Sequence, residues 1–343
     1  MTREIFLPIS LNLESYLEFS KKLKSVDLIN NKELVKINIT NFSKANGRVE
    51  PFGALMTINS LRLFARLCSE NGVKITLIYT KEEHIKNTYA KSLRFYGSLG
   101  LDIGDSPDVD YQVVNSKNFI PIIKTDFSSI TQALHEQDEI NTISKRMARV
   151  LSKENKNLYD YTYFCINEIL RNVLEHSGKK EIWYCAQYWP TTIGGKLIEV
   201  CIMDEGMGIH TSLINELGDE EENILKFSLV PGCSSKPTTH YIESAPNSGF
   251  GLFMTSEIGK DNGEFIIASN SDLLHAAGPM EEYLECYSAG TVICLRLHID
   301  TLKDYNLKND ELINKGLEMA QEYNRYRERK KFAPGLKIES FFK

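Results

Sequence analysis

The sequence has no excess of positive charge and no long apolar run. Of its 343 residues, 40 are Lys or Arg and 46 are Asp or Glu, which gives a formal net charge of -6. A protein that binds nucleic acid mainly through charge carries a basic excess, so we expect no nucleic-acid partner. No uncharged apolar stretch reaches the length of about 18 residues that a membrane helix requires, so we expect no membrane partner either.

The sequence also lacks the cysteine patterns of secreted proteins and metal sites. It contains seven cysteines, an odd number, and no CxxC spacing. Disulfide frameworks use even numbers of cysteines, and zinc sites use closely spaced pairs. No apolar signal segment follows Met1. These features predict a protein of the reducing cytoplasm.

Two common nucleotide-binding motifs are missing. No Gly-x-x-x-x-Gly-Lys-[Ser/Thr] sequence occurs, which excludes a P-loop NTPase. Gly249-Phe250-Gly251 resembles the start of a dinucleotide fingerprint, but the later glycine of that motif is absent. Any nucleotide must therefore be bound in another way.

The length predicts about two domains, since a domain averages roughly 150 residues. Residues 102–110 are acidic and rich in turn-forming residues, which indicates a linker, and we place the boundary near residue 112. The predicted regions are 1–112, 113–300 and a charged helical tail, 301–343. Five basic residues gather in 325–331, with Glu322 and Glu328 mixed in. They could contact nucleic acid or an acidic partner, but the mixed charge favours a solvated helix end.

The first region shows a strand, helix, strand, helix order. Apolar and polar residues alternate in 34–39 and 73–79, which predicts two strands, and residues 52–69 carry an apolar stripe at helical spacing. A second helix is predicted at 85–99. This order favours a small α/β domain with a right-handed crossover.

The second region is also predicted to be α/β. A long segment, 210–248, separates the second and third of its four predicted strands. A short apolar run at 119–123 comes first. The predicted elements are then helices at 139–152 and 158–176, strands at 181–188 and 197–203, a helix at 250–258, and strands at 264–268 and 291–297.

Three polar residues recur every four positions in the predicted helix 158–176. Glu168, Asn172 and His176 should therefore share one face of that helix. Taken alone, the pattern is also that of an ordinary amphipathic helix with a solvated polar stripe.

Glycine-rich segments follow at three predicted element ends. Asp204-Glu205-Gly206-Met207-Gly208 ends a strand, Asn247-Ser248-Gly249-Phe250-Gly251-Leu252 precedes a helix, and Ser288-Ala289-Gly290-Thr291 opens the last strand. Each could be a simple turn. Glycines before a helix also leave N–H groups that can bind phosphate.

Taken in this order, the four motifs resemble the N, G1, G2 and G3 boxes of the Bergerat-fold ATPase superfamily, abbreviated GHKL, over about residues 119–300. That superfamily includes gyrase, heat-shock chaperones, histidine kinases and mismatch-repair proteins. Residues 167–176 look closest to the anti-sigma-factor serine kinase branch. The resemblance implies an α/β sandwich in which a mixed sheet carries helices on one face.

The resemblance implies roles for individual residues. Glu168 would be the catalytic general base, Asn172 the Mg²⁺ ligand, and Asp204 the acceptor for the exocyclic amine of adenine. Guanine has a carbonyl at that position, so adenine is favoured. Segment 210–248 corresponds to the ATP lid. The other predicted ATP-binding residues are His176, Gly206, Gly208, Lys236, Ser248, Gly249, Phe250, Gly251, Leu252 and Thr291.

The first region weakly resembles a STAS domain, the fold of anti-sigma-factor antagonists. Those proteins carry a phosphorylation site before the first helix, where this chain has Glu50-Pro51-Phe52-Gly53, and the nearest hydroxyl is that of Ser43. We therefore expect partner docking rather than a phosphorylation switch. A fragment starting near Val113 should fold and bind ATP, unless residues 119–123 are wedged between two interdependent regions.

Together these features predict a cytoplasmic, Mg²⁺-dependent, ATP-binding regulatory protein with ATPase or protein-kinase activity that gates a protein interaction. The alternatives are a non-catalytic ATP-sensing switch and a serine kinase of a separate partner protein. The partner is unidentified. A protein of the same operon is one candidate, and a homodimer is compatible with the sequence.

Overall fold

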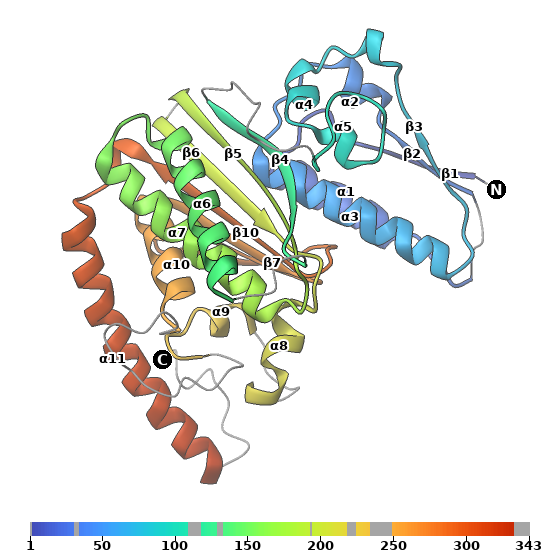
Figure 1. Ribbon diagram of the computed structural model, residues 1–343. Helices are drawn as coiled ribbons and strands as arrows, with labels where there is room; N and C mark the ends of the chain where they lie inside the picture. The colour runs from blue at the N-terminus through green and yellow to red at the C-terminus, as the bar shows by residue number, and fades with distance from the viewer. Residues whose placement is uncertain are drawn as a thin grey trace.

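The computed structural model describes residues 2–30, 34–108, 118–128, 133–192, 194–217, 224–233 and 249–332. Two β-sheets and the helices that pack on them form the structure (Figure 1). The predicted α/β class is confirmed. Within these described ranges, no helix combines the length and apolar character that crossing a membrane requires.

The first region is built on a three-stranded parallel sheet. Its strands β1 (Thr2–Phe6), β2 (Leu34–Asn38) and β3 (Ile75–Ile78) lie in the order β1-β2-β3. The connections contain α1 (Leu13–Lys24) and α3 (Pro51–Glu70), and α3 confirms the helix predicted at 52–69. The sequence analysis missed β1 and α1.

The single helix predicted at 85–99 is wrong. The chain forms a short helical turn (Glu82–His84), then α4 (Thr88–Ser92) and α5 (Phe95–Ser98). Arg94, between α4 and α5, has φ 65°. This left-handed conformation cannot continue a right-handed helix. The remaining helix, α2 (Thr40–Lys44), follows β2.

The second region is built on a seven-stranded sheet in the order β4-β5-β6-β10-β7-β8-β9. Every described neighbouring pair is antiparallel, so the expected mixed sheet is wrong. The sequence analysis missed β8 and β9, which extend the sheet beyond β7. The strands are β4 (Phe119–Asp126), β5 (Glu181–Thr192), β6 (Gly195–Met203), β7 (Gly263–Ser269), β8 (Asp272–Ala277), β9 (Met280–Glu285) and β10 (Thr291–His298).

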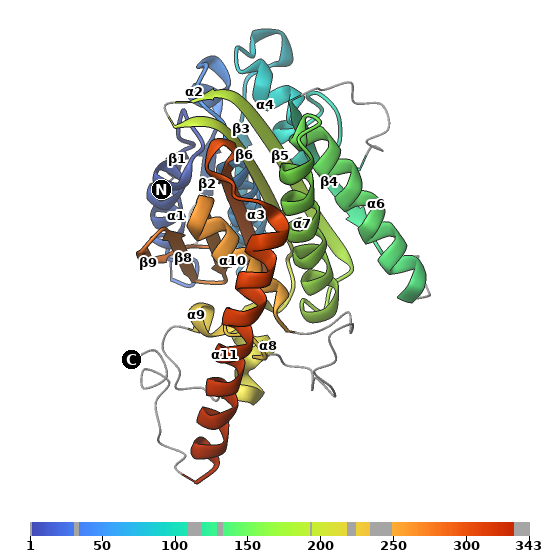
Figure 2. The same ribbon diagram turned by 90° about the vertical axis from the view of Figure 1, so that its left-hand side faces the viewer.

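Three long helices cover one face of this sheet (Figures 1 and 2). The covering helices are α6 (Ala133–Ser152), α7 (Lys156–His176) and α10 (Gly251–Asn262). Two short helices, α8 (Gly208–Leu217) and α9 (Ile224–Ser228), lie near one end. A helical turn (Ile299–Thr301) leads into α11 (Tyr305–Phe332).

The opposite face of the seven-stranded sheet packs against α3 of the first region. Side chains alternate along the strands, so Tyr184 of β5 faces α6 and α7, whereas the neighbouring Cys185 belongs to the buried cluster that contains α1 and α3. The helices of the second region lie on one face of its sheet, as expected, and the first region covers the other face. The first region shares one continuous core with the sheet, and the predicted boundary near residue 112 lies outside the described residues.

The C-terminal helix α11 packs against the body of the second region. Tyr323 and Tyr326 are buried, and a Cβ on Gly316 would lie 2.6 Å from the ring of Phe250. The expected solvated helix end is therefore wrong for these residues, because one face of α11 is apolar. Residues 333–343 lie outside the described part of the chain.

Candidate functional site

The polar stripe of α7 is only partly solvated. The helix begins at an Asn155 cap, whose side chain accepts the Leu158 N–H at 2.9 Å. Glu168 is 9% exposed, whereas Asn172 and His176 are half-buried. The alternative interpretation, an entirely solvated stripe, is therefore wrong at Glu168.

The Glu168 carboxylate lies against the start of α10. A Cβ on Gly251 would lie 1.7 Å from Glu168 Oε2, so any other residue there would displace the Glu168 carboxylate. Arg171 donates a hydrogen bond to the same oxygen. Burial raises the pKa of Glu168, and the charge of Arg171 opposes that shift. The structure thus brings Glu168 together with the second glycine of the segment before α10.

Asp204 follows β6 and is 1% exposed. Its Oδ1 accepts the N–H of Gly206 at 2.7 Å, and its own N–H donates to the carbonyl of Thr291 at 2.9 Å. Burial raises the pKa of the Asp204 carboxyl to about 7, although the Gly206 and Thr291 amides favour the charged form. A buried carboxyl with such a pKa is typical of a functional site.

The loop after Asp204 contacts the end of α7. A Cβ on Gly206 would lie 2.1 Å from the carbonyl oxygen of Ser177, the residue after His176. The Met207 N–H donates to that same oxygen at 2.9 Å. His176 therefore lies at the junction between α7 and this loop.

The loop before β10 closes on Asp204 from the other side. Gly290 has φ 66°, and a Cβ there would lie 2.6 Å from Asp204 Oδ1. Thr291, the next residue, is the first of β10. The structure thus brings the Asp204 loop together with the segment before the last strand.

Gly208 begins α8 with φ 78°, close to the end of β7. The Ser269 hydroxyl accepts the Ile209 N–H at 2.8 Å and donates to the Gly290 carbonyl at 3.1 Å. Sequence reasoning missed Ser269 and also Arg171. A polar residue at the end of an apolar strand is the signal that could have identified Ser269.

The segment before α10 forms a tight turn. Gly249 has φ 70°, and its carbonyl accepts the Gly232 N–H at 3.3 Å. Phe250 precedes the helix without a side-chain cap, and Leu252 packs against the second region's core. Lys236 and Ser248 lie outside the described residues, as do 218–223 and 234–248 of the predicted lid.

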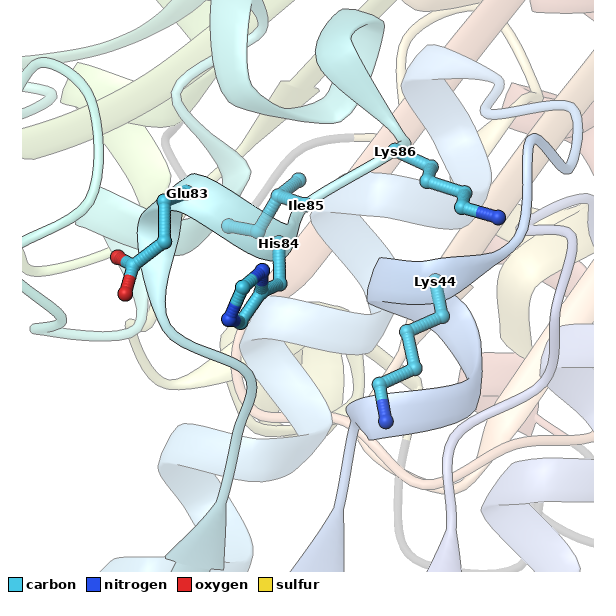
Figure 3. Close-up of a pocket in the computed structure, with 5 residues that line it drawn as sticks. All are labelled: Lys44, Glu83, His84, Ile85 and Lys86. Carbon is cyan, nitrogen blue, oxygen red and sulfur yellow. The ribbon is translucent and has the colours of Figure 1, made fainter.

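A surface pocket of about 360 Å³ lies elsewhere, in the first region. It is lined by Lys44, Glu83, His84, Ile85 and Lys86. Figure 3 shows Glu83 pointing away from the two lysines, and the amino groups of Lys44 and Lys86 pointing in different directions. These side chains do not converge on one ligand position. The neighbouring Ser43 is fully buried, and its hydroxyl donates to the Ile39 carbonyl.

The chain matches no family model, and no curated protein or solved structure is significantly similar to it. In the described part of the chain, no group of three or more His, Cys, Asp or Glu side chains could hold a metal ion. All seven cysteines are free and buried.

Proposed function

We propose that the protein is a Mg²⁺-dependent, ATP-binding regulator of the GHKL type, with ATPase or protein-kinase activity that gates a protein interaction. The observation that carries this proposal is that α7 contacts the other motif segments at two places, the Gly251 segment at Glu168 and the Asp204 loop just after its C-terminus. The Asp204 loop touches Ser177 after α7 and Gly290 before β10, and Glu168 touches Gly251.

Adenine is the base that Asp204 fits. Its exocyclic amine would donate to the carboxylate, whereas guanine would place a carbonyl there and leave a buried acceptor without a donor. The N–H groups of Gly206 and Thr291 already favour the charged form of Asp204. Binding of adenine would add another donor and would therefore lower the pKa of Asp204 from about 7.

The phosphates would lie at the start of α10. The first N–H groups of a helix have no partners within it, and Phe250 supplies no side-chain cap. The helix dipole also favours a phosphate at that end. Asn172, one helical turn after Glu168, offers an amide oxygen to Mg²⁺, which would take its other ligands from phosphate and water.

Glu168 is suited to accept a proton from water or from a protein hydroxyl. Burial raises the pKa of its carboxyl, so it is a stronger base than an exposed glutamate. The second candidate function is a non-catalytic ATP-sensing switch. The hydrogen bond from Arg171 favours it, because a carboxylate paired with a guanidinium is less available as a base.

The partner would be an unidentified protein, either a serine-kinase substrate or a bound regulator, with the product of a gene in the same operon as one candidate. Seven free cysteines favour a reducing, cytoplasmic compartment.

Incubation with γ-labelled ATP and Mg²⁺ tests the proposal. Glu168→Gln should reduce release or transfer of label at least 100-fold and leave ATP affinity within threefold, since it removes the base. Asp160→Asn, near the start of the same helix and paired there with Lys156, is the matched control and should retain activity. Asn172→Ala should lose the Mg²⁺-dependent part of ATP affinity.

The outcomes separate the candidates. ATP binding without release or transfer of label, in the presence of candidate partners, would favour the sensing switch. Absence of ATP binding by the wild-type protein would contradict both.

A further inference from the structure

We propose that Asn59 and Arg62 of α3 are positioning residues of the nucleotide site, so that the first region holds the loops that carry Asp204. This inference rests on the proposed function. It goes beyond the resemblance, which assigns the nucleotide site to the second region alone.

Asn59 forms a two-bond clamp on the loop before β10. Its Nδ2 donates to the carbonyl of Ala289 at 2.9 Å, and its Oδ1 accepts the Ala289 N–H at 2.7 Å. Asn59 is fully buried, and Ala289 is 8% exposed. Because both backbone groups are buried, loss of Asn59 would leave a donor and an acceptor without partners.

The same loop is held at a second point. Tyr16 of α1 accepts the Tyr287 N–H at 3.2 Å, and Ser60 of α3 donates to the Tyr287 carbonyl. Tyr16 is fully buried. Two helices of the first region therefore fix two neighbouring positions of this loop.

Arg62 holds the other loop of the site. Its Nε and Nη2 donate to the two carboxylate oxygens of Glu205 at 2.8 and 2.9 Å. The guanidinium also lies 5.0 Å from the ring centroid of Trp183. Glu205 directly follows Asp204, so this bidentate pair orients the backbone that carries the proposed adenine acceptor.

α3 is itself fixed against the sheet. The Phe52 N–H at its start donates to Glu199 Oε1 at 2.7 Å. Glu199 is fully buried in β6, and Arg296 Nε donates to its other oxygen at 3.1 Å. The helix therefore has a defined position along the sheet and can act as a rigid support.

Short contacts lead from the clamp to Asp204. Ala289 precedes Gly290, where a Cβ would lie 2.4 Å from the Asp204 carbonyl and 2.5 Å from the Gly206 nitrogen. The loop before β10 cannot move toward Asp204 without displacing the Asp204 loop. Loss of the Asn59 clamp would therefore act on the Asp204 loop through this direct contact.

Two pairs of variants test the inference in the full chain. Asn59→Leu removes both clamp bonds, and Thr57→Val is its matched control, because Thr57 is buried on the same helix and its hydroxyl has no partner. Arg62→Met removes the bidentate pair. Arg66→Met removes the same charge from the next turn of α3. If Asn59→Leu does not fold, Arg62→Met, whose side chain is 40% exposed, still provides the test.

Two readouts are needed. Hydrogen exchange without nucleotide reports on the amides of Gly206, Met207 and Ile209, each of which donates a hydrogen bond in this structure. Calorimetry with ADP and Mg²⁺ reports on the site. We expect at least tenfold faster exchange and tenfold weaker ADP binding for Asn59→Leu, about threefold changes for Arg62→Met, and less than twofold changes for both controls.

The results distinguish this inference from the proposed function. If the wild-type protein binds ADP and the folded Asn59→Leu and Arg62→Met variants match it in both readouts, the inference is overturned and the function stands. If the wild-type protein binds no adenine nucleotide, the proposed function fails, and with it the role of these residues in a nucleotide site. Equal loss in the variants and their controls would indicate general destabilisation and would also overturn the inference.

Discussion

The two faces of the seven-stranded sheet are packed in different ways. The face toward α6, α7 and α10 is apolar, with residues such as Tyr184, Val200 and Leu295 in its core. The face toward α3 includes the buried Glu199 and the partly buried Arg296 among cysteines and other apolar side chains. Apolar contacts tolerate small shifts, whereas hydrogen-bonded ions require one geometry. The first face therefore stabilises the fold mainly by burying apolar side chains, whereas the ion pairs and hydrogen bonds of the second face fix the position of α3.

The candidate site lies at one end of the seven-stranded sheet, where α7 on one face and α3 on the other both contact the loops that follow the strands. From one side, α7 brings Glu168 and the Ser177 carbonyl. From the other, α3 brings Asn59 and Arg62 to the loops beside Asp204. The account therefore predicts that damage to the α3 side affects the nucleotide site as well as stability.

The largest expected effect comes from removing the first region. The fragment 113–343 would expose the sheet face that includes Trp183, Cys185 and Met203, which are at most 2% exposed in the full chain. We expect this fragment to be insoluble or to unfold without cooperativity, because such a face needs a partner. This reverses the expectation from the sequence. A soluble fragment with a sharp thermal transition and ATP affinity would show that α3 is dispensable.

The next effect comes from Arg296. Its guanidinium contacts Glu50, Glu199 and Glu264. Arg296→Met should cost about 3–5 kcal/mol of unfolding free energy in urea titrations, because it leaves the fully buried Glu199 carboxylate without a counter-ion. Leu295→Met, on the same strand but the opposite face, is the control and should cost less than about 1.5 kcal/mol. Equal costs would mean that the two faces are equivalent.

A smaller effect, of opposite sign, is expected at Asp204. The pKa of Asp204 in the folded protein is about 7, above its ordinary value of 3.8. At a pH between these two values, Asp204 is therefore protonated in the folded protein and ionised in the unfolded chain. The stability contribution of Asp204 is complete below about pH 4 and falls as the pH rises to 7.

Asp204→Asn, which cannot ionise, should therefore stabilise the nucleotide-free protein by about 4 kcal/mol at pH 8, by less than half of that at pH 5, and by less than about 1 kcal/mol at pH 4. Urea unfolding at the three pH values measures this gain. A gain that does not depend on pH would show that Asp204 is not the titrating group.

The sequence patterns predicted individual helices more accurately than they predicted which elements contact one another. Helical spacing identified α3 and α7, and both were confirmed to within about two residues at each end. The α3 contacts were not predictable in this way, since Asn59 and Ala289 are 230 positions apart. Local periodicity carries no information about such a pair.

One overlooked signal was present in the strands. The segment Ile182–Ala186 contains Ile, Trp, Tyr, Cys and Ala in succession, and all five are buried. A continuous apolar strand indicates burial on both faces, whereas alternation indicates one. This pattern could have predicted a second covering layer.

Hydrogen exchange with and without Mg²⁺-ATP tests most directly whether the separate motifs form one nucleotide site. The account predicts slower exchange, on adding ATP, in three segments together: 203–209, 249–255 and 287–292. GTP at the same concentration should leave them unchanged. Protection confined to the pocket around Lys44 and Lys86, or no protection in these three segments at saturating ATP, would contradict the central claim.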